Sequence, residues 1–128
     1  MNGKEILVDT NIVLYLLDGS DTLASFLEGK KVYLSFISEL ELLGYKDIDP
    51  KQEKEILELI SDCSILPLTD LIKRKYVALR KLHKIKLADA LIAATAIVMG
   101  VPLITSDADF KKISELDLIT YKHGIDLT

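Results

Sequence analysis

Short apolar runs alternate along the chain with longer segments in which apolar residues recur every three or four positions. The short runs predict β-strands at residues 5–8, 31–35, 65–68, 101–104 and 118–121. The longer segments predict helices near residues 12–17, 21–29, 36–44, 50–61, 70–82, 87–99 and 110–116. Strands that are separated by one or two helices favour a mostly parallel sheet with helices on both faces. We therefore expect a three-layer α/β/α domain of the α/β class with about five strands.

The segment 87–99 is the most apolar of the predicted helices. It has no polar stripe along its length, which is typical of a helix that is buried on all sides. Gly100 follows it and suits a left-handed helix cap. Asp89 lies in its first turn, where an ionised carboxylate is costly unless it is paired, capped or bound to a metal ion.

Acidic residues occur where several of these elements begin or end. Asp9 ends the first strand and Asp107 follows the fourth, while Glu41 and Asp89 lie on helices that leave the same edge of the predicted sheet. Ligands of α/β folds bind at the carboxyl ends of the strands. Four carboxylates could therefore converge at one edge.

Each of these acids also has an ordinary structural interpretation. Asp9 or Asp89 could cap a helix, as could Thr10 or Asn11 in place of Asp9. Glu41 could face solvent, and Asp107 or Asp109 could shape a turn. Together the ordinary interpretations weaken, because two carboxylates about 4 Å apart repel each other by about 4 kcal/mol at an effective dielectric constant of 20. A divalent cation would remove that repulsion.

The ligand types in this cluster favour a hard cation. Oxygen ligands alone favour Mg²⁺ or Mn²⁺, whereas zinc sites usually include cysteine or histidine. Cys63, His83 and His123 lie outside the acidic segments.

Length and composition fit one domain over residues 1–128. At 14.3 kDa a chain can bury enough surface to fold without disulfides, and a single cysteine cannot form one internally. The N-terminal apolar run is too short for a secretory signal, and the longest apolar stretch, residues 90–104, is too short to span a membrane. We expect a soluble, cytoplasmic protein that does not associate with a membrane.

The charge of the chain is unevenly distributed. The net charge is −4, yet residues 73–86 contain seven of the 16 Lys and Arg and no acid. Such a segment can contact phosphates, and it can equally be a solvated helix surface. The candidate RNA-binding residues on this predicted helix and just after it are Lys73, Arg74, Arg80, Lys81 and Lys84.

Four motifs occur in order along nearly the whole chain. They are Asp9-Thr10-Asn11 after a strand, Glu41-Leu42-Leu43 on a helix, residues 87–94 (LADALIAA) and residues 105–110 (TSDADF). In this order and spacing they resemble the PIN domain, and more narrowly the toxin nucleases of VapBC-type toxin–antitoxin modules. Each motif is weak by itself, but four in register are specific.

The resemblance implies a ribonuclease that depends on Mg²⁺ or Mn²⁺ and hydrolyses RNA phosphodiester bonds. Its catalytic, metal-binding pocket would consist of Asp9, Glu41, Asp89 and Asp107. Asp9 and Asp89 match the most constant metal ligands of the family, and the other two acids would complete the pocket directly or through water. The bound ion would acidify a water molecule and offset charge that builds on the phosphate oxygens.

Several neighbouring residues have supporting or open roles. Thr10, Asn11 and Thr105 would orient the carboxylates through hydrogen bonds. Asp109 has no assigned role, and its simplest interpretation is a cap for the helix that contains Phe110. Glu39 competes with Glu41, which matches the motif better because it precedes Leu-Leu-Gly.

The resemblance also implies a homodimer and a small antitoxin that blocks the pocket. Three alternatives remain at this point. The chain could be a PIN-like module that binds RNA or protein without cutting, or an RNA-processing nuclease that is not a toxin. A phosphoacceptor receiver domain also uses acids at strand ends with Mg²⁺, but it has no place for Glu41 and Asp89 on helices.

Overall fold

The sheet carries the architecture of the molecule. In the computed structural model, which describes residues 4–122, five strands form one sheet in the order β3-β2-β1-β4-β5, with every pair parallel. The strands are β1 (Glu5–Val8), β2 (Lys31–Ser35), β3 (Ser64–Leu66), β4 (Leu103–Thr105) and β5 (Leu118–Thr120). The prediction of an α/β fold with a mostly parallel five-stranded sheet is confirmed.

Six α-helices and one short 3₁₀ helix connect the strands of the described chain. They are α1 (Thr10–Leu17), α2 (Asp21–Leu27), α3 (Phe36–Leu43), α4 (Pro50–Ser61), α5 (Asp70–Leu82), α6 (Leu87–Met99) and η1 (Ala108–Lys112). The expectation of a helix over residues 110–116 was wrong, because η1 starts earlier and ends at Lys112. Phe110 and Ile113 are both buried, and a 3₁₀ turn places side chains three positions apart above one another.

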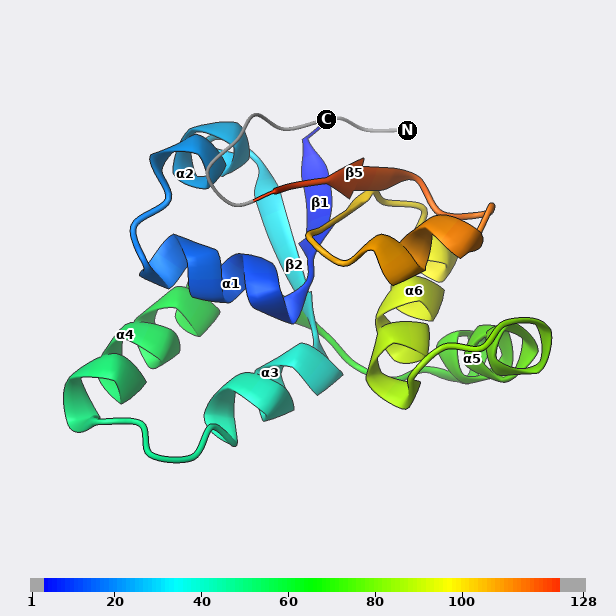
Figure 1. The fold of residues 1–128 in the computed structure, drawn as a ribbon, viewed down its shortest axis with the longest axis horizontal. Coiled ribbons are helices and arrows are strands. Elements are labelled where there is room, and N and C mark those ends of the chain that lie inside the picture. The colour runs from blue at the N-terminus through cyan, green and yellow to red at the C-terminus, as the bar shows by residue number, and fades with distance from the viewer. Residues whose placement is uncertain (1–3, 123–128) are drawn as a thin grey trace.

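The helices form two layers, one on each face of the sheet (Figure 1). Leu7 and Leu103 pack with α5 and α6 in one core, whereas Val8 and Ile104, the next residue on each strand, pack with α1, α2 and α4 in the other. This alternation follows the two-residue period of a strand. The three-layer α/β/α arrangement is therefore confirmed.

Helix α6 is the central helix of its layer, and its middle is fully enclosed. Residues 90–96 are buried, but Leu87 and Met99 at its ends are 52% and 43% exposed. The prediction of burial on all sides was therefore wrong for the ends. A helix of 13 residues is about 20 Å long, whereas strands of three to five residues span about 10–17 Å, so both ends project past the sheet. Gly100 caps the helix at φ 68°, as predicted.

The strand order reverses direction at β1. From β1 the chain moves outward to β2 and β3, and it then returns to place β4 and β5 on the other side. A crevice forms at such a reversal outside the carboxyl ends of the strands, here β1 and β4. In Figure 1 this is the edge from which α1 and α3 leave and at which α6 begins. Among residues 4–122, no helix is both long and apolar enough to cross a bilayer.

Candidate active site

Asp9 occupies the junction between β1 and α1 at this edge. It is 5% exposed and is the N-cap of α1, where its Oδ1 accepts a hydrogen bond from Thr10 N at 2.7 Å. Its Oδ2 accepts from Thr105 Oγ1 at 2.6 Å, at the end of the adjacent strand β4. Of the three predicted cap candidates, Asp9, Thr10 and Asn11, it is therefore Asp9 that caps α1. Both carboxylate oxygens are fixed, so the group has one orientation.

Thr10 links α1 to α3. Its Oγ1 donates to Glu41 Oε1 at 2.7 Å, and it also lies 2.9 Å from the hydroxyl of buried Ser38. Ser38 precedes Glu41 by three residues, so both face α1 from the same side of α3. These bonds hold the exposed Glu41 carboxylate toward β1.

Thr105 and Asp107 form the β4 side of the site. Thr105 is fully buried, and besides donating to Asp9 its Oγ1 accepts from Asp107 N at 3.0 Å. Asp107 caps η1, since its Oδ1 accepts from Asp109 N at 2.9 Å. The interpretation of Asp109 as a cap was therefore wrong: Asp109 lies one position inside the helix and is exposed.

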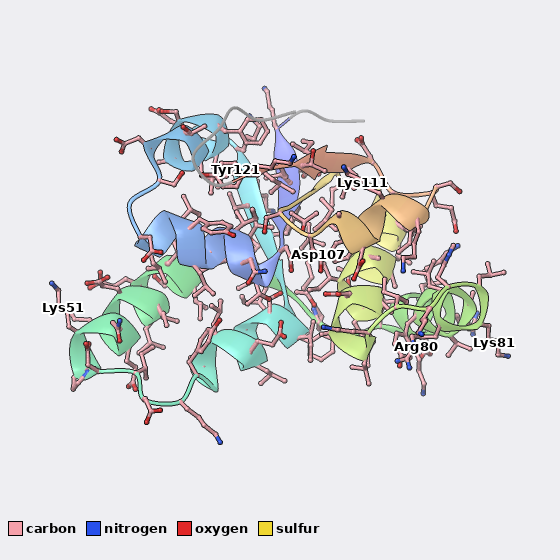
Figure 2. All side chains as sticks on the ribbon, in the orientation of Figure 1. Lys51, Arg80, Lys81, Asp107, Lys111 and Tyr121 are labelled. Atoms are coloured by element: carbon pink, nitrogen blue, oxygen red, sulfur yellow. The ribbon has the colours of Figure 1, made fainter. Side chains whose placement is uncertain are left out.

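All four predicted acids line one cavity of about 530 Å³. Its lining residues are Asp9, Thr10, Asn11, Glu41, Gly44, Tyr45, Lys46, Asp89 and Asp107. Glu39 and Asp109 are not among them, so Glu41 is the acid that α3 contributes. Figure 2 shows Asp107 near the middle of the molecule, with the α5 residues Arg80 and Lys81 beyond α6. Thr105 does not line the cavity, but it donates a hydrogen bond to Asp9, which does.

Two carboxylates of this cavity, Asp9 and Asp89, have raised pKa values. Burial raises the pKa of Asp9, hydrogen bonds from Thr105 and Thr10 oppose that shift, and the charges of Glu41 and Asp107 add to it. Burial also raises the pKa of Asp89 to about 6; the other three acids contribute in the same direction, whereas Lys86 lowers it. Burial combined with repulsion among neighbouring carboxylates is the electrostatic pattern expected of a cation site.

The side chains that line the cavity offer only oxygen ligands to a metal ion, apart from the ammonium of Lys46. Within residues 4–122 no group of three or more Asp, Glu, His or Cys side chains is placed so that together they could hold a metal ion. The oxygen-only lining still fits Mg²⁺ or Mn²⁺, because such ions keep several waters and need only one or two carboxylates. Cys63 and His83 are not in the lining, and His123 lies outside the described residues.

The five candidate RNA-binding residues are all exposed, on α5 or just after it. Arg80 is held over the ring of Tyr76, with Nη1 donating to the Tyr76 hydroxyl at 3.0 Å. Because α5 packs against α6, this surface lies on the side of the molecule that contributes Asp89.

Sequence reasoning did not identify Ser38, Gly44, Tyr45 and Lys46. Ser38 could have been found from its three-residue spacing to Glu41 on one helix face. Tyr45 and Lys46 belong to a turn between two helices, and nothing in their local pattern indicates that this turn reaches the acids.

Known proteins share this architecture. The family model for the PIN domain matches residues 6–116. The toxin–antitoxin complex from Klebsiella pneumoniae is 33% identical, with a TM-score of 0.74 over 87% of this chain and 94% of that chain. VapBC2 from Rickettsia felis, bound to a DNA fragment from their promoter, has a TM-score of 0.83 at 24% identity, over 92% and 99% of the two chains. FitAcB from Neisseria gonorrhoeae has a TM-score of 0.74 at 25% identity, over 88% and 95%. No curated protein matches the chain.

The strand order also bears on the receiver-domain alternative. Receiver-type folds have the order 2-1-3-4-5, with the second and third strands on opposite sides of the first. Here β2 and β3 lie on the same side of β1. That alternative is therefore excluded by topology.

Proposed function

The chain belongs to the PIN-domain family, and from this premise we propose that it is a ribonuclease that depends on Mg²⁺ or Mn²⁺ and hydrolyses phosphodiester bonds in RNA. We further propose that it is the toxin of a toxin–antitoxin pair. The observation that carries the nuclease proposal is the meeting of four carboxylates, from four separate parts of the chain, in one cavity at the reversal of strand order.

Each acid of the cavity has a proposed role. Asp9 and Asp89 would hold the ion, and Glu41 and Asp107 would complete the pocket directly or through water. A bound divalent ion supplies acidity to a water molecule and compensates charge on the phosphate. Thr105 and Thr10 keep the Asp9 carboxylate oriented, and Asn11 lines the cavity beside them.

The basic surface of α5 is proposed to bind the RNA backbone. An acidic cavity repels phosphates, so cations on the surface around it would favour the binding of a nucleic acid. Lys73, Arg74, Arg80, Lys81 and Lys84 would provide these contacts.

A small protein antitoxin is the proposed partner, with the chain itself a homodimer. The support for the antitoxin comes from two neighbours, which are described as a toxin–antitoxin complex from Klebsiella pneumoniae and as VapBC2 from Rickettsia felis, whereas the homodimer is implied only by the family resemblance. Size-exclusion chromatography with light scattering tests the dimer, and a monomer at every concentration would contradict it.

Incubation of the purified protein with total RNA tests the nuclease function. We expect cleavage with Mn²⁺, none with chelator, and at least about a 100-fold loss in Asp9→Asn and Asp89→Asn variants that fold. Asp109→Asn, which changes an acid outside the cavity, should cleave normally. Full activity in both cavity variants would refute the site.

The mapped cut ends also bear on the two remaining alternatives. Absence of metal-dependent cleavage would favour a PIN-like module that binds RNA or protein. Cuts that only mature a precursor RNA, leaving translation intact, would favour a processing nuclease over a toxin.

A further inference from the structure

A basic side chain lines the acidic cavity from the turn between α3 and α4. Lys46 is the one Lys or Arg among the described residues that form the lining. In the described part of the chain, its ammonium group has no ion-pair or hydrogen-bond partner. Lys46 lines a cavity with four carboxylates, yet its ammonium group pairs with none of them and is available to a ligand.

The negative charge of the cavity would repel a phosphodiester, and the ammonium of Lys46 offsets part of that charge. With four ionised carboxylates and one ammonium, the lining carries three net negative charges, and one divalent cation would leave a net negative charge. The phosphodiester of the substrate is also negatively charged. Without Lys46, the cavity with its divalent cation would carry twice this residual negative charge and would repel the phosphodiester more strongly. Lys86, the other cation near the acids, already acts on Asp89 and lowers its pKa.

Tyr45, the residue before Lys46, lines the same cavity. It is 44% exposed, and it also lines a second cavity of about 460 Å³ together with Leu14, Leu17 and Ile56. An exposed ring next to a free cation is the pairing with which proteins bind single-stranded nucleic acid, with the base on the ring and the phosphate on the cation.

The backbone of this turn is tightly specified. At Gly44 an added Cβ would lie 3.0 Å from the carbonyl oxygen of Leu40, so a larger residue would require the backbone there to shift by a few tenths of an ångström. At Asp47 the chain reverses at φ 59°, a left-handed conformation that aspartate tolerates better than most residues. Tyr45 and Lys46 lie between these two constrained positions.

We infer that Tyr45 and Lys46 form a subsite for one nucleotide of a single-stranded RNA, next to the bond that is cut. Lys46 binds a phosphate oxygen of that nucleotide and Tyr45 stacks on its base. The inference rests on the proposed ribonuclease function and adds to it the residues that position the strand.

The test uses the full chain and an RNA oligonucleotide that spans a mapped cleavage site. With Mn²⁺, we expect Lys46→Ala to lower kcat/KM about tenfold, mainly through KM, and Lys46→Arg to restore most of it. The slope of log kcat/KM against log salt concentration should become shallower by about 0.7 in Lys46→Ala. Tyr45→Leu should lower kcat/KM about fivefold and Tyr45→Phe should not.

Two controls separate phosphate binding from other effects. Lys51→Ala removes an exposed lysine of α4 that lies at the end of the molecule away from Asp107 (Figure 2), and it should change neither kcat/KM nor the salt slope. Calorimetric titration with Mn²⁺ alone should show that Lys46→Ala does not weaken metal affinity, because the substitution removes a positive charge from the cavity.

The outcomes distinguish this inference from the function on which it rests. Unchanged kcat/KM and salt slope in Lys46→Ala, with active wild-type protein, would overturn the subsite alone. Weaker Mn²⁺ binding in Lys46→Ala would overturn it too, since the lysine would then shape the metal site. Absence of cleavage by the wild-type chain would refute the proposed ribonuclease, and the subsite with it.

Discussion

The ionised side chain of Asp89, which is proposed to hold a metal ion, lowers the stability of the metal-free protein. Burial and the neighbouring acids raise its pKa to about 6, so the folded chain favours its protonated form. The folded-state pKa exceeds the unfolded value of 3.8, and the resulting stabilisation is therefore complete below about pH 4 and lost as the pH rises through 6. At neutral pH, without metal, the ionised side chain destabilises the fold.

Replacement of Asp89 should therefore stabilise the metal-free protein. In chelator at pH 7.5 we expect Asp89→Asn to raise the free energy of unfolding by about 1 kcal/mol, after allowance for partial exposure. Near pH 4 the gain should vanish, because the wild-type side chain is then protonated. Thermal unfolding of both proteins across this pH range measures the effect, with Asp109→Asn as a control that should match wild type at each pH. A lower stability of Asp89→Asn at pH 7.5 would contradict the assigned repulsion.

Thr105 does not line the cavity, but its hydrogen bond orients the Asp9 carboxylate and lowers the pKa of that group. Thr105→Val keeps the shape of the side chain but removes the 2.6 Å hydrogen bond to Asp9 Oδ2, which opposes the rise in the pKa of Asp9. We expect about 1–3 kcal/mol lower stability and about tenfold weaker Mn²⁺ binding. Urea unfolding and calorimetry measure the two effects. Thr105→Ser keeps the hydroxyl and should bind Mn²⁺ almost as wild type does; equal weakening in both variants would assign the effect to packing instead.

Sequence reasoning predicted the convergence of residues whose type and local position are both informative. Asp9 and Asp107 each follow a strand, Asp89 lies in the first turn of α6 and Glu41 lies on α3, and the fold brings all four to one cavity. Lys46 has no such local context: its place beside the acids depends on how far α3 extends before the chain turns. Distances of that kind are set by tertiary packing, which hydrophobic periodicity does not encode.

At the level of helices and strands, the ends were harder to predict than the elements themselves. Pro67 limits β3 to Ser64–Leu66, since proline cannot donate to a strand partner. Residues 101–102 are buried and the carbonyl of Pro102 accepts a hydrogen bond from Leu7 N of β1, but β4 begins only at Leu103, so the apolar run predicted a longer strand than the structure has. An apolar run therefore indicates which residues are buried, whereas hydrogen bonding to the neighbouring strands determines where the strand begins and ends.

Gly100 gives a direct test of helix termination. It adopts φ 68° with nothing within 4 Å of an added Cβ, so Gly100→Ala pays only the cost of a left-handed backbone. We expect a loss of about 1 kcal/mol in urea unfolding, and a smaller loss for Gly100→Asn. RNA cleavage below the unfolding transition should be unchanged, because Asp89 lies at the opposite end of α6. A loss above about 3 kcal/mol would mean that the glycine also prevents a steric clash.

The molecule as a whole separates its charges. The acids gather where the strand order reverses, whereas the α5 cations lie on the outer side of the adjacent helix layer, as Arg80 and Lys81 do in Figure 2. Each acid comes from a different part of the chain, so the repulsion among them exists only in the folded state. A cation bound there would connect β1, α3, α6 and the end of β4.

Metal binding should therefore stabilise the whole fold. Because the carboxylates separate on unfolding, Mn²⁺ at 100 times its dissociation constant should raise the free energy of unfolding by about 2.7 kcal/mol. Urea unfolding with Mn²⁺, with chelator, and with chelator added after Mn²⁺ measures the gain and its reversal. Asp9→Asn should lose most of the gain, whereas Asp109→Asn, which alters an exposed acid outside the cavity, should keep it. An equal gain in wild type and Asp9→Asn would place the bound ion elsewhere on the protein, and would remove the physical basis for treating the four acids as one site.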